Sequence, residues 1–253
     1  MPKSFEHKKG DMNDEKRCVA EKVWEQFICT DKNPRIFIDA GSSAAVIAEI
    51  IKERKATDRT TPVVMTHNWA AWDALRRETD MDVYFIGGKY SPVLNACIEP
   101  KTFELQLETL TPNIMIIAVS GIDGKGLYCS NHQDEAPIKT AIAAKPVEKR
   151  IIIGDHTKIG DTDVRSFISL EELKHNCSEV YLLTDKFDYR SLEPTYKSAK
   201  YIDTLECFNK IHGGGCAVSD FEHSSNIIFV PVTPTSTATQ NESDNPGESS
   251  QSV

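Results

Sequence analysis

Short clusters of Gly, Ser, Thr, Asp, Glu and Lys recur along this chain, and their side chains have the chemistry to hold a small anion. In chain order they are Asp39-Ala40-Gly41-Ser42-Ser43, Thr66-His67-Asn68, Gly87-Gly88, Ser120-Gly121-Ile122-Asp123, Asp134-Glu135 with Lys139, and Asp155-His156-Thr157-Lys158. Backbone N–H and hydroxyl groups donate hydrogen bonds to phosphate oxygens, and a lysine ammonium adds a positive charge. Carboxylates accept hydrogen bonds from hydroxyl groups and can transfer protons. The clusters therefore suit binding of a phosphorylated molecule, acid–base chemistry on it, or both.

The first cluster lies inside a strand–turn–helix segment at residues 35–51. The apolar run before Asp39 predicts a buried strand, Gly41 allows a sharp turn, and Ser42 or Ser43 can cap the helix that follows. This geometry directs free N–H groups and the positive end of the helix dipole to one point beyond the strand, where a phosphate can bind. A capped strand–helix junction with no ligand is the more common meaning of such a turn, so both interpretations stay open at this point.

The elements that must position these clusters alternate between strands and helices. An amphipathic helix is expected at residues 13–27, and strands at 36–38, 63–68, 82–86, 113–120, 150–154, 180–184 and 226–232, with helices between most of them and one at 202–211. This rhythm predicts right-handed crossovers and a mostly parallel sheet with helices on both faces. Because ligands bind beyond the carboxyl ends of parallel strands, where the clusters fall, the clusters can converge on one site.

Composition predicts a protein of the cytoplasm that is not built to bind nucleic acid. The net charge of −9 disfavours a duplex-binding surface, and the seven cysteines lack C-x-x-C spacing and resemble reduced thiols. No apolar run reaches the ~20 residues of a membrane span, and the N-terminus lacks the apolar core of a signal peptide. The histidines are spaced too irregularly to indicate a metal, and neither a metal nor a cofactor is expected.

The predicted organisation is a flexible N-terminus at residues 1–11, one α/β domain at 12–232, and a disordered tail at 233–253. The tail has almost no apolar residues and cannot contribute to a core.

Taken together and in this order, the clusters resemble the signatures of the C-terminal sensor domain of the DeoR family. That family typically shows D-A-G-T-T, T-N, G-G, G-x-D-G-I-D, a helix with E-x-x-x-K or E-x-x-K, and D-x-S-K-F-G. The resemblance spans residues 13–185. It implies the three-layer fold shared by ribose-5-phosphate isomerase, glucosamine-6-phosphate deaminase and CoA transferases. It also implies a phosphorylated sugar or a similar small anionic metabolite as the ligand.

The resemblance also implies a set of ligand-binding residues. The turn after the first strand would donate hydrogen bonds to the phosphate, the next two clusters would bring a second backbone segment to the ligand, acidic residues would accept from sugar hydroxyls, and lysines would add positive charge. The set is Asp39, Gly41, Ser42, Ser43, Thr66, Asn68, Gly87, Gly88, Ser120, Gly121, Asp123, Asp134, Glu135, Lys139 and Lys158.

Several of these residues have an ordinary alternative. Glu135 and Lys139 could be an exposed i, i+4 pair, worth ~0.3 kcal/mol. Asp123 could stabilise only its own turn, and Asp155 could cap only its own loop. His67 is expected to be structural or solvated, and the Cys129 thiol to be inert.

Two departures from the family limit how far its functions carry over. About a dozen residues precede the helix at 13–27, where DeoR repressors have a winged helix-turn-helix, so no DNA reader is expected. The related isomerases use D-G-A-D, a Gly-rich segment with Lys, and Glu beside Lys. Here the first position reads Ser120-Gly121-Ile122-Asp123, the Gly-rich segment is absent, and Ile138 precedes Lys139.

The leading prediction is a stand-alone sensor that binds a phosphorylated sugar and signals through a protein partner or its own oligomer. The alternative is a sugar-phosphate isomerase or deaminase that uses Asp123, Glu135 and Lys139, since a displaced carboxylate could replace the missing general base. A third interpretation is a scaffold that has lost ligand binding.

Overall fold

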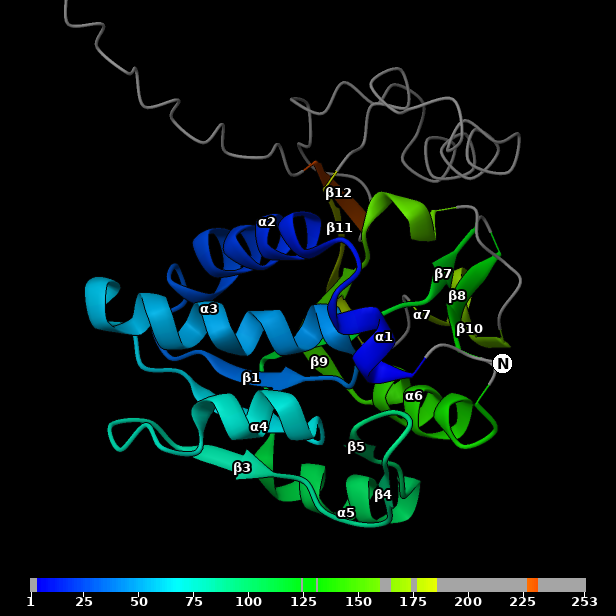
Figure 1. The fold of residues 1–253 in the computed structure, drawn as a ribbon, viewed down its shortest axis with the longest axis horizontal. Coiled ribbons are helices and arrows are strands. Elements are labelled where there is room, and N and C mark those ends of the chain that lie inside the picture. The colour runs from blue at the N-terminus through cyan, green and yellow to red at the C-terminus, as the bar shows by residue number, and fades with distance from the viewer. Residues whose placement is uncertain are drawn as a thin grey trace, which may run out of the picture.

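Runs of β-branched and aromatic residues form a seven-stranded sheet in which every neighbouring pair of strands is parallel (Figure 1). The computed structural model describes residues 4–123, 125–130, 132–159, 165–173, 177–185 and 227–231. The strand order is β12-β11-β9-β6-β1-β2-β3. The strands are β1 (Arg35–Ile38), β2 (Val63–Thr66), β3 (Val83–Phe85), β6 (Ile114–Ala118), β9 (Val147–Ile153), β11 (Cys177–Thr184) and β12 (Ile227–Pro231).

Short strands form two further sheets outside the central one. β7 (Gly121–Ile122), β8 (Gly126–Cys129) and β10 (Arg165–Ser169) pair antiparallel, and β4 (Tyr90–Ser91) pairs with β5 (Ala96–Cys97). The sequence predicted a turn where β7 and β8 form a hairpin, and it gave no indication of β10.

Helices follow most of the strands. They are α1 (Phe5–Lys9), α2 (Asn13–Val23), the π-helical turn η1 (Trp24–Ile28), α3 (Ser42–Asp58), α4 (Trp69–Leu75), α5 (Pro100–Leu110), α6 (Glu135–Ala144), the 3-10 turn η2 (His156–Lys158) and α7 (Leu170–Leu173). The helix predicted at 13–27 is thus α2 continued by η1. The helix predicted at 202–211 and the tail at 233–253 lie outside the described residues.

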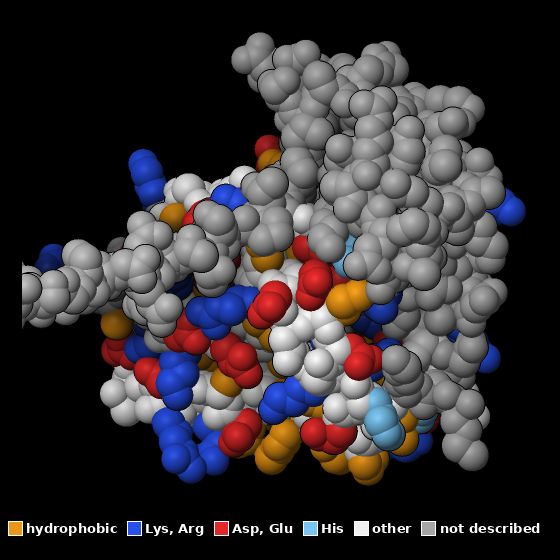
Figure 2. All heavy atoms as spheres, turned by 45° about the horizontal axis from the view of Figure 1, so that its top comes forward, with side chains coloured by type: hydrophobic (Ala, Val, Ile, Leu, Met, Phe, Trp, Pro, Cys, Tyr) orange, Lys and Arg blue, Asp and Glu red, His pale blue; other side chains and the backbone are white. Residues whose placement is uncertain are grey.

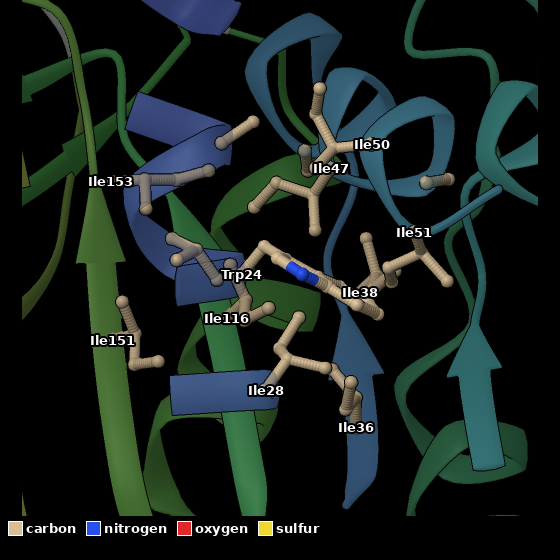
Figure 3. Packing of buried hydrophobic residues seen from close by; sticks show 14 of the residues in the cluster. Trp24, Ile28, Ile36, Ile38, Ile47, Ile50, Ile51, Ile116, Ile151 and Ile153 are labelled. Atoms are coloured by element: carbon tan, nitrogen blue, oxygen red, sulfur yellow. The ribbon is translucent and has the colours of Figure 1, made fainter. Parts of the chain in front are cut away.

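Side chains alternate between the two faces of each strand and produce two separate cores. On β1, Ile36 and Ile38 pack with α2, η1, α3 and α4, whereas Phe37 packs with α5 and α6 on the opposite face. Figure 3 shows the first of these cores, with Trp24 lying among isoleucines of the sheet and of α3. The predicted three-layer α/β fold with helices on both faces is confirmed.

The chain order creates a switch point between β1 and β6. From β1 the chain proceeds outward to β2 and β3, then returns to place β6 on the other side of β1 and proceeds to β9, β11 and β12. The loops after β1 and β6 therefore leave in opposite directions, and open α/β sheets bind ligands at such a switch point. The first and fourth polar clusters of the sequence follow these two strands.

The N-terminus differs from the flexible segment predicted for residues 1–11. Residues 5–9 form α1, because the Phe5 ring is buried and the Ser4 hydroxyl accepts a hydrogen bond from the His7 N–H at the start of the helix. The single aromatic residue among charged neighbours was not recognised as an anchor. In the described part of the chain, no helix is long and apolar enough to cross a membrane.

Candidate functional site

The carboxylate of Asp39 lies at the carboxyl end of β1 and is fully buried. Its Oδ1 accepts a 2.7 Å hydrogen bond from the Ala40 N–H and lies 3.0 Å from His67 Nε2. Its Oδ2 accepts a 2.5 Å bond from Lys139 Nζ and a 3.1 Å bond from the Ala118 N–H. Asp39 thus joins β1, β6, the loop after β2 and helix α6 at the switch point.

Lys139 brings the positive charge of α6 into this centre. Its ammonium also donates a 2.6 Å bond to the Ala118 carbonyl and lies 5.9 Å from the centre of the Phe167 ring. Burial alone would raise the pKa of Asp39 and lower that of Lys139, but their mutual attraction, together with His67 beside Asp39 and Glu135 near Lys139, outweighs burial. The pKa of Asp39 is therefore lowered, that of Lys139 is raised, and both groups are charged. The exposed-pair interpretation of Glu135 and Lys139 is wrong, because Lys139 is buried and pairs with Asp39.

His67 closes the centre on the side of β2. Its Nδ1 lies 2.6 Å from the Cys97 carbonyl oxygen, which can only accept, so Nδ1 carries a hydrogen. The ring is 1% exposed and connects β5 to Asp39. His67 is therefore a structural residue, one of the two roles that the sequence left open for it.

Thr66 and Asn68 are brought to the centre, but their polar atoms bond to the protein itself. The Thr66 hydroxyl donates to the Ile38 carbonyl at 2.7 Å. The Asn68 amide donates to the carbonyls of Asp39 and Gly41 at 3.2 and 3.0 Å, while its oxygen caps α4. Both residues are fully buried, and through these bonds they stabilise the end of β1 and the turn that follows it.

The turn after β1 leaves the N-terminus of α3 open. The sequence predicted Ser42 or Ser43 as the cap, but the N-cap residue is Gly41, and no side-chain hydrogen bond caps this helix. Gly41 has φ of 120°, a conformation that favours glycine. The first N–H groups of a helix have no intrahelical partner, and within the described residues nothing else bonds the N–H groups of Ser42, which is buried, and Ser43. Such groups can bind an anion.

The loop after β6 contributes Ser120 and the hairpin of β7 and β8. Ser120 Oγ accepts a 3.5 Å hydrogen bond from Lys8 Nζ, and Gly121 is buried in the pairing with Tyr128. Asp123 Oδ1 accepts from the N–H groups of Lys125 and Gly126 and from the Tyr128 hydroxyl. These contacts support the turn-forming alternative for Asp123.

The acidic residues at the start of α6 differ in exposure. Glu135 is buried, and its Oε2 accepts hydrogen bonds from the N–H and the hydroxyl of Ser130. Asp134 is partly exposed, and its Oδ2 lies 3.4 Å from Lys89 Nζ. Asp134 is therefore the more accessible of the two carboxylates.

The remaining predicted residues lie in the loops after β3 and β9. Gly87 donates its N–H to Gln106 Oε1, and Gly88 is exposed. No contact with the Asp39 centre is present for either glycine among the described residues. Lys158 Nζ lies 3.7 Å from Asp155 Oδ2, and Asp155 caps η2 through the Thr157 N–H, as its ordinary alternative proposed.

Sequence reasoning missed Lys8, whose ammonium reaches Ser120. Burial and the charge of Glu135 raise the pKa of the Cys129 thiol to about 12, which supports the prediction of an inert thiol. Among the described residues, no group of three or more His, Cys, Asp and Glu side chains could hold a metal ion.

Comparison with known proteins agrees with these observations. The model of the DeoR C terminal sensor domain matches residues 11–180. A lactose phosphotransferase system repressor of Staphylococcus aureus (strain NCTC 8325 / PS 47) is 26% identical over 161 residues, which are 63% of this chain and 59% of the repressor. The match thus covers less than two thirds of that relative's length.

The chain is also similar, at lower identity, to parts of two solved structures. A ribose 5-phosphate isomerase A from Methanocaldococcus jannaschii has a TM-score of 0.41 and 11% identity over 59% of this chain and 57% of the isomerase. An acyl-CoA transferase from Escherichia coli O157:H7 has a TM-score of 0.41 and 12% identity over 68% of this chain and 35% of the transferase.

Proposed function

This chain belongs to the family of DeoR C-terminal sensor domains, and from this premise we propose that it senses a phosphorylated sugar in a regulatory system. The phosphate binds at the N-terminus of α3, near the ends of β1 and β6. The sugar extends toward the start of α6, where Asp134 is the accessible carboxylate. The matched repressor is named for a sugar phosphotransferase system, which supports both the regulatory role and this class of ligand.

The observation that carries the proposal is an uncapped helix of 17 residues beginning beside a buried ion pair. The N–H groups of Ser42 and Ser43 face the switch point, and Asn68 fixes the turn that orients them. A helix N-terminus held rigidly in this way is pre-organised for an anion, because the ligand need not order the loop on binding.

The contacts favour binding over catalysis. Isomerisation needs a general base within hydrogen-bond reach of a substrate carbon. Of the candidate groups, Lys139 is bound to Asp39, Glu135 is bound to Ser130, and Asp123 is bound within its hairpin. Incubation with ribose 5-phosphate and with glucose 6-phosphate, followed by product analysis, tests this preference. Turnover of either compound would favour the enzyme over the sensor.

Signalling is proposed to pass through a protein partner or a second copy of the chain. The net charge is −9, and acidic and basic side chains lie interspersed over the described part of the face in Figure 2. Such a surface does not favour the phosphate backbone of DNA. Electrophoresis of random duplex DNA mixed with the protein at low salt tests whether the chain binds DNA. A retarded DNA band would contradict the expectation that it does not.

Thermal unfolding with matched ligand pairs tests the proposed ligand class. Ribose 5-phosphate, glucose 6-phosphate and fructose 6-phosphate are each compared with the corresponding free sugar. At 100 times its Kd, a ligand stabilises the native state by about 2.7 kcal/mol. We expect at least one phosphorylated member to raise Tm while its free sugar does not, and a panel without any such pair would contradict the proposal.

A further inference from the structure

We propose that helix α1 forms one wall of the ligand site and that Lys8 on this helix binds the phosphate of the ligand. This inference rests on the proposed function, because it adds a residue to the same site. It assigns a ligand-binding role to a segment that precedes the residues matched by the family model, which begin at residue 11.

Helix α1 lies beside the start of α3. Figure 1 shows this helix beside the carboxyl end of β1 and the beginning of α3, and α1 contacts α3. Phe5 is 5% exposed, and its N–H donates a 3.0 Å hydrogen bond to the Val93 carbonyl in the loop between β4 and β5. The N-terminal end of α1 is thus bonded to the loop between β4 and β5.

The C-terminal end of α1 is bonded to helix α2. The buried ammonium of Lys16, on α2, donates hydrogen bonds to the carbonyls of Lys8 and Asp11. The backbone at Lys8 is therefore held by a charge from the neighbouring helix. The backbone of α1 is therefore held at both ends, by Val93 at Phe5 and by Lys16 at Lys8.

The Lys8 ammonium lies close to the loop after β6. It lies 3.5 Å from Ser120 Oγ, at the end of β6 and therefore beside the switch point. Within the described part of the chain, no carboxylate forms an ion pair with it. Burial lowers the pKa of Lys8, Glu135 partly offsets this effect, and the positive charges of Lys139 and Lys158 lower the pKa further.

These surroundings favour an anionic ligand. A partly buried ammonium near two other ammonium groups is unfavourable unless a negative charge compensates it. A phosphate between Lys8 and the N-terminus of α3 would supply that charge and would accept hydrogen bonds from the ammonium, the Ser120 hydroxyl and the helix N–H groups. Lys8 then connects ligand binding to the position of α1.

Calorimetric titration with ribose 5-phosphate, glucose 6-phosphate, fructose 6-phosphate and inorganic phosphate tests the inference in four proteins. These are the wild type, Lys8→Met, Lys8→Arg and the matched control Lys9→Met, whose side chain is exposed on the same helix. Loss of a charged hydrogen bond should weaken binding at least about tenfold in Lys8→Met. Lys9→Met should bind as the wild type does, and Lys8→Arg should regain part of the affinity.

The unliganded proteins distinguish this role from a structural one. If Lys8 only stabilised the fold through Ser120, Lys8→Met would lower Tm without ligand, and that result together with unchanged affinity would overturn the inference. We expect an unchanged or higher Tm, because the variant removes a partly buried charge that Glu135 compensates only in part.

Limited trypsin digestion gives a second readout, because Lys8 and Lys9 are themselves cleavage sites. A saturating ligand should protect both bonds in the wild type, and unchanged cleavage would contradict a wall that contacts the ligand. Wild-type affinity in Lys8→Met would overturn the role of α1 while leaving the proposed function intact. Absence of binding to the wild type would overturn both.

Discussion

Asp39 and Lys139 are 100 positions apart in the sequence and form a buried ion pair at the centre of the site. Two charges removed from water are stable there because each also bonds the backbone of Ala118. The pair therefore fixes α6 against the ends of β1 and β6, and it places a positive charge behind the proposed phosphate position.

Replacing one member of this pair should be costly. Lys139→Met leaves the Asp39 carboxylate buried without its cation, so we expect a loss of about 3–5 kcal/mol in the free energy of unfolding. Urea unfolding measures this change, and Lys101→Met on the exposed start of α5 is the matched control. A loss below about 1 kcal/mol would contradict the role assigned to the pair.

The pair also predicts how stability depends on pH. Because the folded pKa of Asp39 is lowered, its contribution is present above the unfolded value of about 3.9 and is lost as the pH falls through the folded value. Because the folded pKa of Lys139 is raised, the contribution of Lys139 to the free energy of unfolding is present below the unfolded pKa of about 10.4. This contribution is lost as the pH rises through the folded pKa. The stability difference between the wild type and Asp39→Asn/Lys139→Met should be constant between about pH 5 and 9 and change below about pH 4. A stability difference between these two proteins that changes with pH near neutrality would contradict this account.

For single residues, the sequence predicted that Asp39 and Lys139 belong to one site, but it did not predict their contacts, and Gly87 and Gly88 do not contact the Asp39 centre in the described residues. The positions of Asp39, Gly41 and Lys139 in family order placed them at one site. The i, i+4 spacing of Glu135 and Lys139 suggested a mutual pair, because local spacing cannot reveal a partner in another strand. Lys8 was missed for the same reason, since its contact with Ser120 joins residues 112 positions apart.

Among the elements, the hairpin of β7 and β8 positions the loop after β6. Its strand β8 pairs with β10 so closely that a Cβ on Gly126 would lie 2.3 Å from the Ile168 carbonyl oxygen. We expect Gly126→Ala to destabilise the protein by about 1–3 kcal/mol, because backbone atoms must move to admit the methyl group.

Gly10→Ala is the control for that substitution. A Cβ at Gly10 would have no atom within 4 Å, so its effect should stay within about 0.5 kcal/mol. Thermal unfolding of the two variants compares them directly, and equal stability would show that the approach of β8 to β10 is not restrictive.

The long apolar strands were predictable from composition, whereas the short ones were not. β6 is buried at every position and was recognised by its continuous apolar run. β7 has only two residues, and its pairing depends on a partner strand rather than on its own pattern. The cap of α3 was mispredicted because Ser42 and Ser43 are good cap residues in isolation, while the geometry of Gly41 moved the boundary by one residue.

For the whole molecule, the sheet order determines where the site lies. Alternation of strands and helices predicted a parallel sheet, but the placement of β6 beside β1 depends on contacts between distant segments. That placement brings the turn after β1, the end of β6 and helix α6 together at the Asp39 centre. The proposed ligand site is therefore a property of the topology as much as of its residues.

The most direct test of phosphate binding at α3 is calorimetric titration of the wild type and Ser43→Asp with the best sugar phosphate of the panel. An acidic residue in the first turn is compatible with a helix and brings a negative charge to the proposed phosphate position. Thr57→Asp, with the same charge at the exposed far end of α3, is the control. We predict at least about tenfold weaker binding for Ser43→Asp at unchanged folding and wild-type affinity for Thr57→Asp. Equal affinity in all three proteins would contradict the account.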